Sequence, residues 1–312
     1  MANYLVTGAA GFIGSALARR LLDEGHQVAS IDNLSTGFLD NLPAGTSFVE
    51  GDCADPAMYQ KIPQHKYDAI LHIAGQSSGE VSFDDPIYDI RTNAESTLLL
   101  LKFALTNGCR RFIFASTMSV YGVKPDIPID EDQDCAPESF YGVAKLASEH
   151  YMRIYQQYGI DSTALRLFNV YGPGQNLKNL RQGMVSIFVA QMFEDAAIQV
   201  KGSADRYRDF IYIDDVVDAF VNSIDCRTAG SQVINVATGV RTSVGELLQV
   251  IVSKHDQAVE IGYSGSTSGD IHGIRAEVVK MREILGINNT LDLEQGITKM
   301  LDWVRAVHDR QA

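Results

Sequence analysis

Three glycines spaced three residues apart follow the first apolar segment and constrain the fold more than any other feature. Gly8, Gly11 and Gly14 come directly after Tyr4–Val6, a short apolar run typical of a buried strand. Gly8 permits a tight turn, Gly11 lets the backbone approach a phosphate, and Gly14 lets the next helix pack closely on the sheet. That helix, expected over 12–24, offers unpaired N–H groups and a positive dipole end. The pattern therefore predicts a site for a dinucleotide pyrophosphate.

A carboxylate at the end of the next strand supports this interpretation. The apolar run 27–31 ends at Asp32, close to the ~20-residue spacing expected for a carboxylate that binds the adenosine ribose hydroxyls. Because a carboxylate would repel a 2′-phosphate, NAD is favoured over NADP. The alternative is a glycine-rich turn that binds no ligand. We prefer the dinucleotide site because the strand, the helix and Asp32 occur in the expected order.

Composition excludes several classes of protein. The chain has 312 residues, enough for one large α/β unit or two lobes, and a net charge of −13 that argues against binding nucleic acid or an anionic membrane. No apolar run reaches about 18 residues and the first strand begins near Met1, so we expect neither a membrane span nor a signal peptide. Widely spaced cysteines favour reduced thiols in a cytoplasmic protein and no metal site: Cys53, Cys109, Cys135 and Cys226.

Strand-like and helix-like segments alternate through the first half of the chain. Further strands are expected at 47–50, 69–73, 111–115 and 162–167, with helices near 57–62, 87–106 and 141–158. This alternation predicts an α/β fold with a Rossmann-type, doubly wound parallel sheet. Beyond Tyr171 the segments become shorter and mixed. We therefore predict a dinucleotide-binding domain over 1–171 plus about 210–236, and a smaller mixed α/β substrate-binding lobe over about 172–209 and 237–312.

A tyrosine and a lysine on one predicted helix are candidate catalytic residues. Tyr141 and Lys145 are four residues apart and so share a helix face. A nearby ammonium stabilises a phenolate and a cationic nicotinamide helps, so we expect the pKa of Tyr141 to fall from about 10 toward neutrality. Such a tyrosine takes a proton from an alcohol while hydride leaves the same carbon. The alternative is a chance pair on an amphipathic helix.

Hydroxyl groups at the end of a predicted strand supply a third partner. The run 111–115 leads into Ser116, Thr117 and Ser119, at the carboxyl edge of the sheet where ligands bind in such folds. One hydroxyl there is placed to hydrogen-bond the reacting oxygen. The alternative is that these residues only form a turn.

The ordered motifs as a whole resemble a known family. They are Gly8-x-x-Gly11-x-x-Gly14, Asp32–Gly37, Gly51-Asp52, Leu71–Gly75, Asn93, Thr117, Tyr141-x-x-x-Lys145, Arg166–Gly174, Arg208–Asp215, and Glu294-x-Gly296-Ile297 with Trp303. The chain resembles the extended short-chain dehydrogenases/reductases, specifically the NAD-dependent sugar-nucleotide epimerase/dehydratase family that includes UDP-galactose 4-epimerase. The resemblance covers essentially the whole chain.

The resemblance implies a role for each matching position. The catalytic residues would be Thr117, Tyr141 and Lys145. The cofactor would be bound by Gly8, Gly11, Phe12, Ile13, Gly14, Asp32, Asn33, Ser35, Thr36, Gly37, Asp52, Cys53, Ile73, Ala74, Gly75, Asn93, Tyr141, Lys145 and Phe168. The nucleotide-diphospho-sugar would contact Ser77, Thr117, Asn169 and Arg208. An arginine suits a diphosphate because its planar fork pairs with phosphate oxygens, although Arg208 has the alternative of a surface ion pair with Asp205 or Asp209.

Two departures from the family bear on the reaction. Its 4,6-dehydratases place Asp-Glu after the threonine and its decarboxylases Ser-Glu, whereas this chain has Met118 and Ser119. The missing carboxylates favour epimerisation at carbon 4. Many relatives also carry an arginine at the position of Thr267; Arg206, Arg241 or Arg275 is the candidate replacement. A buried Glu80, in the uninterpreted segment 76–80, would disfavour an acidic sugar.

Alternatives remain for the activity and for assembly. A related NAD(H)-dependent oxidoreductase would use the same three residues with net cofactor turnover, and a non-catalytic dinucleotide sensor would need none of them. Two predicted helices have apolar faces that must be buried, and the resemblance implies that these helices pair with their copies in a homodimer, with burial inside one chain as the alternative. These faces comprise Leu98–Leu101, Phe103 and Ala104 on one helix, and Leu146, Tyr151, Ile154 and Tyr155 on another.

Overall fold

A seven-stranded parallel sheet forms the centre of the molecule. The computed structural model describes residues 1–226, 232–265 and 271–311. The strands are ordered β12-β7-β5-β4-β1-β2-β3. Their bounds are β1 Asn3–Thr7, β2 Gln27–Asp32, β3 Ser47–Glu50, β4 Ala69–His72, β5 Arg111–Thr117, β7 Asp161–Leu167 and β12 Gln232–Val236. The chain runs outward from β1 to β3 and then returns to β4, so the order reverses between β1 and β4. The predicted doubly wound Rossmann-type sheet is confirmed.

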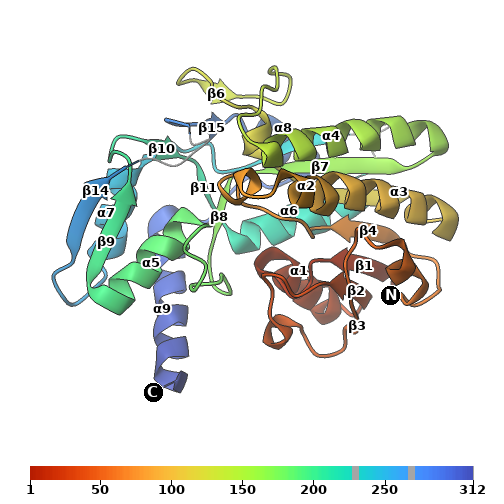
Figure 1. Ribbon diagram of the computed structural model, residues 1–312, viewed down its shortest axis with the longest axis horizontal. Coiled ribbons are helices and arrows are strands. Elements are labelled where there is room, and N and C mark those ends of the chain that lie inside the picture. Colours follow the sequence, from red (N-terminus) through yellow and green to blue (C-terminus); the bar gives the residue numbers. More distant parts are fainter. Residues whose placement is uncertain (227–231, 266–270, 312) are drawn as a thin grey trace.

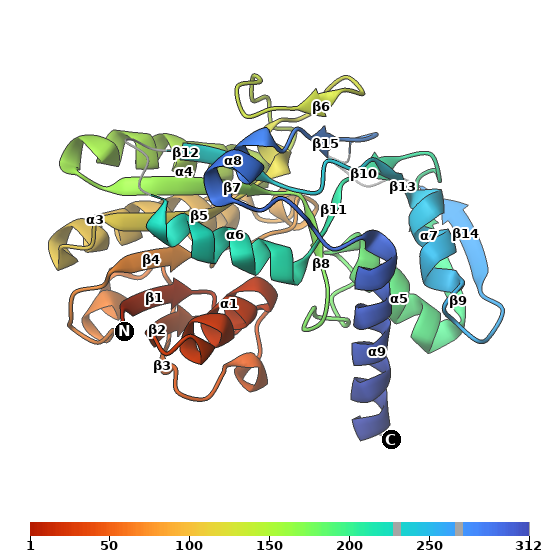
Figure 2. The ribbon, with the colours of Figure 1, turned by 180° about the vertical axis from the view of Figure 1, so that it is seen from behind.

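Helices cover both faces of this sheet. Figure 2 shows α1 (Phe12–Asp23) and α6 (Ile213–Asp225) on one face, and Figure 1 shows α3 (Ser96–Asn107) and α4 (Phe140–Tyr155) on the other. Neighbouring residues of β5 point to opposite faces: Ile113 packs with the α1–α6 side and Phe112 with the α3 side. A sheet that is buried on both faces requires strands that are nearly continuously apolar, and the strands of this sequence have that composition.

Two predicted helices differ from the structure. The segment near 57–62 forms only a 3-10 turn, Pro56–Gln60, and the segment 87–106 is not a uniform α-helix. It comprises α2 (Pro86–Ile90), a π-helical turn (Arg91–Glu95) and then α3. π-helical turns occur frequently at functional sites, because the extra residue re-aims side chains. The remaining 3-10 turns are Leu39–Asn41, Val81–Phe83, Met118–Val120 and Gln156–Tyr158.

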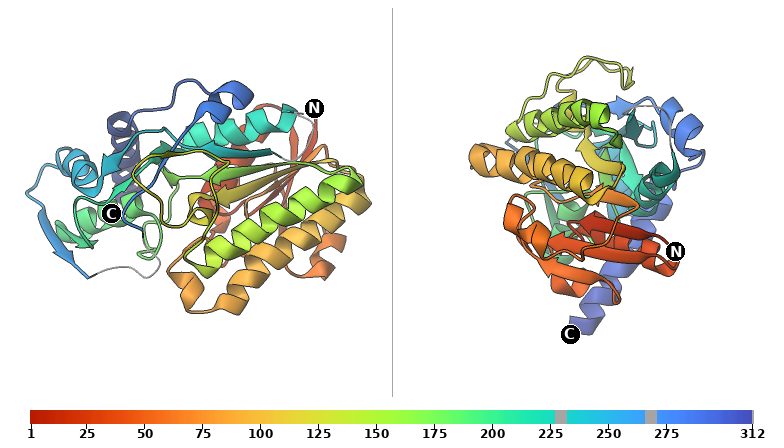
Figure 3. Two further views of the ribbon diagram at one scale, coloured as in Figure 1. Left: turned by 90° about the horizontal axis from the view of Figure 1, so that it is seen from above. Right: turned by 90° about the vertical axis from the view of Figure 1, so that its right-hand side faces the viewer.

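The remaining elements lie outside this sheet, most of them beyond the carboxyl ends of its strands (Figures 1 and 3). The helices are α5 (Met184–Asp195), α7 (Val244–Val252), α8 (Val279–Leu285) and α9 (Leu293–Gln311). The strand pairs are β8 (Asn169–Tyr171) with β11 (Phe210–Tyr212), β9 (Ala197–Lys201) with β14 (Glu260–Ser264), β10 (Tyr207–Arg208) with β13 (Thr242–Ser243), and β6 (Pro128–Ile129) with β15 (Arg275–Ala276). Although α8 lies beyond residue 237, it contacts α6 and β12. The division into two domains at that residue stays a prediction.

A buried ion pair fixes α4 to the strands beneath it. Glu149 lies two turns after Tyr141 on α4 and accepts from Arg166 on β7 at 2.7 and 3.0 Å. Ser116, at the end of β5, also donates to Glu149. Both partners of the ion pair are only 5% exposed at their side chains. This network sets the register between the helix that carries Tyr141 and the strand that carries Thr117.

We predict that Glu149→Gln lowers the free energy of unfolding by about 3–5 kcal/mol, because it leaves the Arg166 guanidinium buried without a balancing charge. Urea unfolding followed by circular dichroism measures the change. The matched control is Glu95→Gln, which breaks the exposed Arg91–Glu95 pair and should change stability by less than about 0.5 kcal/mol. Equal losses in the two variants would contradict the anchoring role.

Candidate functional site

Two adjoining cavities lie at the carboxyl edge of the sheet. The first has a volume of about 370 Å³ and follows the ends of β1, β2, β4, β5 and β7, and the second, of about 330 Å³, continues it toward α5 and β9. Both are lined by Ser77, Gly79, Met118, Ser119, Asn169, Gln182, Gly183 and Met184. The pair therefore forms one continuous hollow at the point where the strand order reverses, which is where ligands bind in open α/β sheets.

The glycine turn after β1 forms one end of the first cavity. Gly8 has a φ of +72°, and a Cβ there would lie 2.8 Å from the backbone N of Ala74. A Cβ on Gly14 would collide with the carbonyl oxygen of Gly8. The N-cap of α1, Gly11, has no side-chain cap, and Gly11–Gly14 line the cavity. The start of α1 thus presents backbone to the cavity, as an anionic diphosphate site requires.

Asp32 has a structural role that the sequence analysis missed. One carboxylate oxygen accepts from the backbone N of Ala10 at 2.9 Å, and the other accepts from the backbone N of Leu34 at 2.8 Å. The side chain therefore ties the glycine turn to the loop after β2 while it lines the cavity. The position of Asp32 about 20 residues after the glycine turn indicated a carboxylate that binds the ribose. The same position is also explained by the two hydrogen bonds that join these loops.

The structure brings most of the predicted cofactor residues to the first cavity. They are Gly8, Gly11, Phe12, Ile13, Gly14, Asp32, Asn33, Ser35, Thr36, Asp52, Cys53, Ile73, Ala74, Gly75, Tyr141, Lys145 and Phe168. Two predicted residues do not line it. Gly37 packs beneath the turn, where a Cβ would lie 2.7 Å from the carbonyl oxygen of Ala10. Asn93 lies behind Gly75 and donates to the carbonyl oxygen of Gln76 at 2.9 Å.

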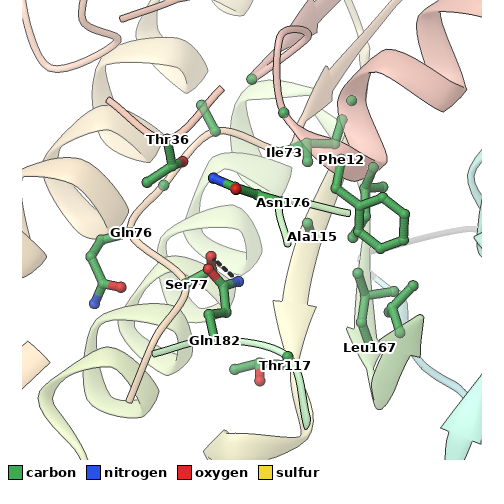
Figure 4. Close-up of a pocket in the computed structure, with 18 of the residues that line it drawn as sticks. Phe12, Thr36, Ile73, Gln76, Ser77, Ala115, Thr117, Leu167, Asn176 and Gln182 are labelled. Carbon is green, nitrogen blue, oxygen red and sulfur yellow. Dashed lines mark hydrogen bonds between the residues drawn. The ribbon is translucent and has the colours of Figure 1, made fainter. Parts of the chain in front are cut away.

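The predicted substrate residues lie around the junction of the two cavities. Thr117 lines the first cavity, Ser77 and Asn169 line both, and Arg208 lines the second. Figure 4 shows the side chain of Gln182 donating to Ser77, a hydrogen bond of 2.6 Å. Sequence reasoning missed Gln182 and Asn176, which reach the cavity from the irregular segment 174–183. That segment has no periodicity, so nothing in its sequence indicates which side chains point inward.

The three catalytic candidates are buried together. Tyr141 is 8% exposed, Thr117 6% and Lys145 3%. The Nζ of Lys145 donates to the carbonyl oxygen of Ala115 at 2.9 Å and lies 5.8 Å from the centroid of the Tyr141 ring. Thr117 also accepts from the backbone N of Ser119 at 3.1 Å. The hydroxyl therefore forms a turn, as the alternative proposed, and faces the cavity as well.

The expected fall in the pKa of Tyr141 is wrong for the protein alone. Burial raises the pKa of this phenol to about 12, against a lowering contribution from its hydrogen bond with Thr117, and the charge of Asp89 raises it further. Burial lowers the pKa of the Lys145 ammonium to about 8. The prediction counted the lysine charge and omitted the desolvation of both groups. The positive charge of an oxidised nicotinamide beside Tyr141 would favour the phenolate.

Charged residues line the second cavity. Arg208 is 3% exposed and donates to the carbonyl oxygens of Ile271 at 2.9 Å and His272 at 3.2 Å, so the alternative of a surface ion pair is wrong. The Glu80 side chain is 28% exposed and pairs with Lys201 at 3.4 Å and Arg181 at 3.5 Å. Its charge is therefore balanced by Lys201 and Arg181. Because Glu80 is not buried, the condition under which it would disfavour an acidic sugar is not met.

The candidate replacements for the family's arginine differ in position. Arg206 lines the second cavity and donates to the carbonyl oxygen of Lys201. Arg241 instead pairs with Asp126 at 3.5 Å, and neither it nor Arg275 lines the two cavities. Thr267 itself, with the segment 266–270, lies outside the described residues.

In the part of the chain that the structure describes, no group of three or more His, Cys, Asp or Glu side chains is arranged to hold a metal ion. Over the same residues, no helix is both long and apolar enough to cross a membrane.

The chain is similar to proteins of known sequence over nearly its full length. The family model described as the NAD dependent epimerase/dehydratase family matches residues 4–237. A UDP-glucose 4-epimerase of Mycolicibacterium smegmatis is 36% identical over 308 residues, covering 96% of this chain and 98% of the relative. A dTDP-4-dehydro-6-deoxyglucose reductase of Escherichia coli is 29% identical over 311 residues, covering 96% and 97%.

Solved structures agree with this similarity. The structure of a UDP-glucose 4-epimerase from Thermotoga maritima with UDP-glucose has a TM-score of 0.91 and 33% identity, covering 98% of this chain and 99% of that one. A UDP-glucose 4-epimerase from Thermus thermophilus in complex with NAD has a TM-score of 0.89 and 30% identity, covering 97% and 99%.

We predict that Gly14→Ala weakens NAD⁺ binding at least about tenfold, or ~1.4 kcal/mol, because the added Cβ displaces the start of α1 from Gly8. Isothermal titration calorimetry with NAD⁺ measures the loss. The control is Gly245→Ala on α7, where the nearest neighbour of the new Cβ lies at 3.5 Å, and its affinity should equal that of the wild type. Unchanged affinity in Gly14→Ala would exclude this turn as the diphosphate site.

Proposed function

The chain belongs to the NAD dependent epimerase/dehydratase family, and we propose that it inverts carbon 4 of a nucleotide-diphospho-sugar through a transient 4-keto sugar. The observation that carries this proposal is the burial of Thr117, Tyr141 and Lys145 together in the wall of the first cavity. The first cavity has the glycine turn expected for NAD, and the second has cations suited to a diphosphate.

Each catalytic residue has a distinct task in this reaction. Tyr141, as a phenolate, takes the proton from the hydroxyl at carbon 4, and Thr117 hydrogen-bonds the same oxygen. Lys145 stabilises the phenolate by its charge. NAD, when bound, accepts the hydride from carbon 4 and gives it back. The keto sugar then rotates in the second cavity and presents the other face of carbon 4. Hydride would return to that face and Tyr141 would return the proton, so no net oxidation occurs.

The absence of carboxylates directly after Thr117 argues against water elimination. Dehydration requires an acid and a base in addition to the tyrosine, and Met118 and Ser119 follow Thr117 where those groups would stand. Among the described residues that line the first cavity, the carboxylates are Asp32 and Asp52, both at its adenosine end. Among the described residues that line the second cavity, the carboxylates are Glu80, which is held by two cations, and Glu138, which is exposed. The site therefore suits epimerisation, for which the three catalytic residues suffice.

A related oxidoreductase is the second candidate, because the chain is also similar to a dTDP-4-dehydro-6-deoxyglucose reductase. Such an enzyme uses the same proton donor and the same hydride carrier. It consumes one NADH for each sugar converted, whereas an epimerase recycles its cofactor. The stoichiometry of NADH therefore separates the two.

We predict that the purified protein with NAD⁺ inverts carbon 4 of one member of a panel of UDP-, dTDP-, GDP- and CDP-sugars, followed by NMR, without net change in NADH absorbance. Tyr141→Phe should lower the rate about 10²- to 10⁴-fold, because it removes the proton acceptor. Tyr158→Phe is the matched control, since that tyrosine is exposed and lies outside both cavities. One NADH oxidised per keto sugar reduced would establish the reductase instead.

We also propose a homodimer formed through α2 and α4. Part of the sequence argument is explained within one chain, because Leu100, Leu101 and Ala104 of α3 are buried against the sheet. Other apolar side chains on this side remain exposed: Phe83, Ile87, Ile90, Phe140, Val143 and Ile154. A patch of this kind typically marks an interface, and a second copy presents the same patch in a two-fold dimer.

We predict a mass twice 34.2 kDa by multi-angle light scattering for the wild type and a shift toward monomer for Val143→Glu, which places a charge in the apolar patch. Val279→Glu is the control, since Val279 is exposed on α8 away from this patch. A monomeric wild type would exclude the dimer.

A further inference from the structure

Two buried acceptor atoms lie behind the catalytic lysine. Asp89 lies in the last turn of α2 and Asn93 lies in the π-helical turn, and both residues are fully buried. The Oδ2 of Asp89 and the Oδ1 of Asn93 have no hydrogen-bond partner among the described residues. An unpaired buried acceptor is costly, and a buried carboxylate more so, which means that its presence here requires an explanation.

Asn93 relates this carboxylate to the surroundings of Lys145. The Nδ2 of Asn93 donates to the Oδ1 of Asp89 at 3.2 Å. A Cβ on Gly75 would collide with the Oδ1 of the same asparagine and would lie 3.4 Å from the Nζ of Lys145. Asn93 and the lysine ammonium therefore both approach Gly75, which lines the first cavity together with Lys145, and Asp89 is hydrogen-bonded to this asparagine.

Asp89 also holds the wall itself. Its Oδ1 accepts from the Nε2 of Gln76 at 2.8 Å, and the carbonyl oxygen of Gln76 accepts from Asn93 at 2.9 Å. Gln76 lines the first cavity, and Figure 4 shows it beside Ser77. The segment 75–77 is thereby fixed from behind, next to the residues that face the reacting oxygen.

The charges around Lys145 act in opposite directions. Burial lowers the pKa of its ammonium, and the charge of Asp89 raises it. The same charge raises the pKa of Tyr141. His72, on β4, faces the lysine too, but burial lowers the pKa of this imidazole so far that it is neutral and adds no charge. Burial raises the pKa of the Asp89 carboxyl, and Gln76, Lys145 and Asn93 act against this rise.

We propose that Asp89 is a positioning residue that fixes the segment 75–77 against Lys145 and supplies the buried negative charge that keeps this lysine an ammonium beside Tyr141. The inference rests on the proposed function for the roles of the two catalytic residues. The Asp89 carboxylate would therefore have two opposing effects. It stabilises the Lys145 ammonium, whose charge favours the phenolate of Tyr141, and it raises the pKa of Tyr141 directly.

The test is Asp89→Asn, which retains the size and an acceptor for Gln76 and removes the charge. Ultraviolet titration of the NAD⁺-bound protein reads the ionisation of Tyr141, with Tyr141→Phe in each background subtracting the other tyrosines. Removing a nearby negative charge favours the phenolate, so the pKa of Tyr141 should fall by about one unit. The pKa of the Lys145 ammonium should fall as well, because the variant removes a nearby negative charge. Both limbs of the pH profile of kcat/KM should therefore move to lower pH.

Gln76→Leu is the matched comparison, because it removes the hydrogen bond to Asp89 and leaves the charge. It should lower the rate without moving both limbs to lower pH, which is the result expected of a purely structural role. If Asp89→Asn does not fold, as judged by circular dichroism, Asp89→Ser removes the same charge and is measured instead.

A Tyr141 titration within about 0.2 units of the wild type in the charge-free variant would overturn the proposal. This readout is independent of turnover. A wild type that titrates as expected but converts no sugar would therefore count against the proposed function and leave the role of Asp89 supported.

Discussion

The close approach of backbone to backbone at the end of β1 is the contact on which the rest of the site depends. Gly8 lies against Ala74 and Gly14 lies against Gly8, at separations that leave no room for a side chain. This approach brings the start of α1 to the point where the strand order reverses, with its backbone turned to the cavity. Asp32 then joins the same turn to the next loop, so the dinucleotide end of the site is a single rigid unit.

The other end of the site is controlled by buried charge. Desolvation opposes both the phenolate of Tyr141 and the ammonium of Lys145. In our proposals, the charge of the oxidised cofactor favours the phenolate and the charge of Asp89 favours the ammonium. Farther along α4, the Glu149–Arg166 pair holds the helix to the sheet, so that these electrostatic effects act at fixed distances.

Local patterns in the sequence predicted much of this site. The glycine spacing, Asp32 at a strand end and the Tyr141–Lys145 pair each lie within one turn or one strand end, where spacing fixes geometry. Gly37 and Asn93 were carried over from the family as cofactor residues and instead support the cavity from behind. Gln182 was missed because the segment 174–183 has no periodicity. The short helix expected near 57–62 proved to be a five-residue 3-10 turn, Pro56–Gln60.

The sequence by itself determined the family, the parallel sheet and the glycine turn, and it supplied the Tyr141–Lys145 pair that we propose as catalytic, because each depends on residues close together in the chain or on their order. Only the tertiary structure decided the ionisation of that pair, the burial of Arg208, the balanced charge of Glu80 and the position of Asp89 behind Lys145. These properties depend on desolvation and on contacts between segments distant in the chain, and neither is encoded in local spacing.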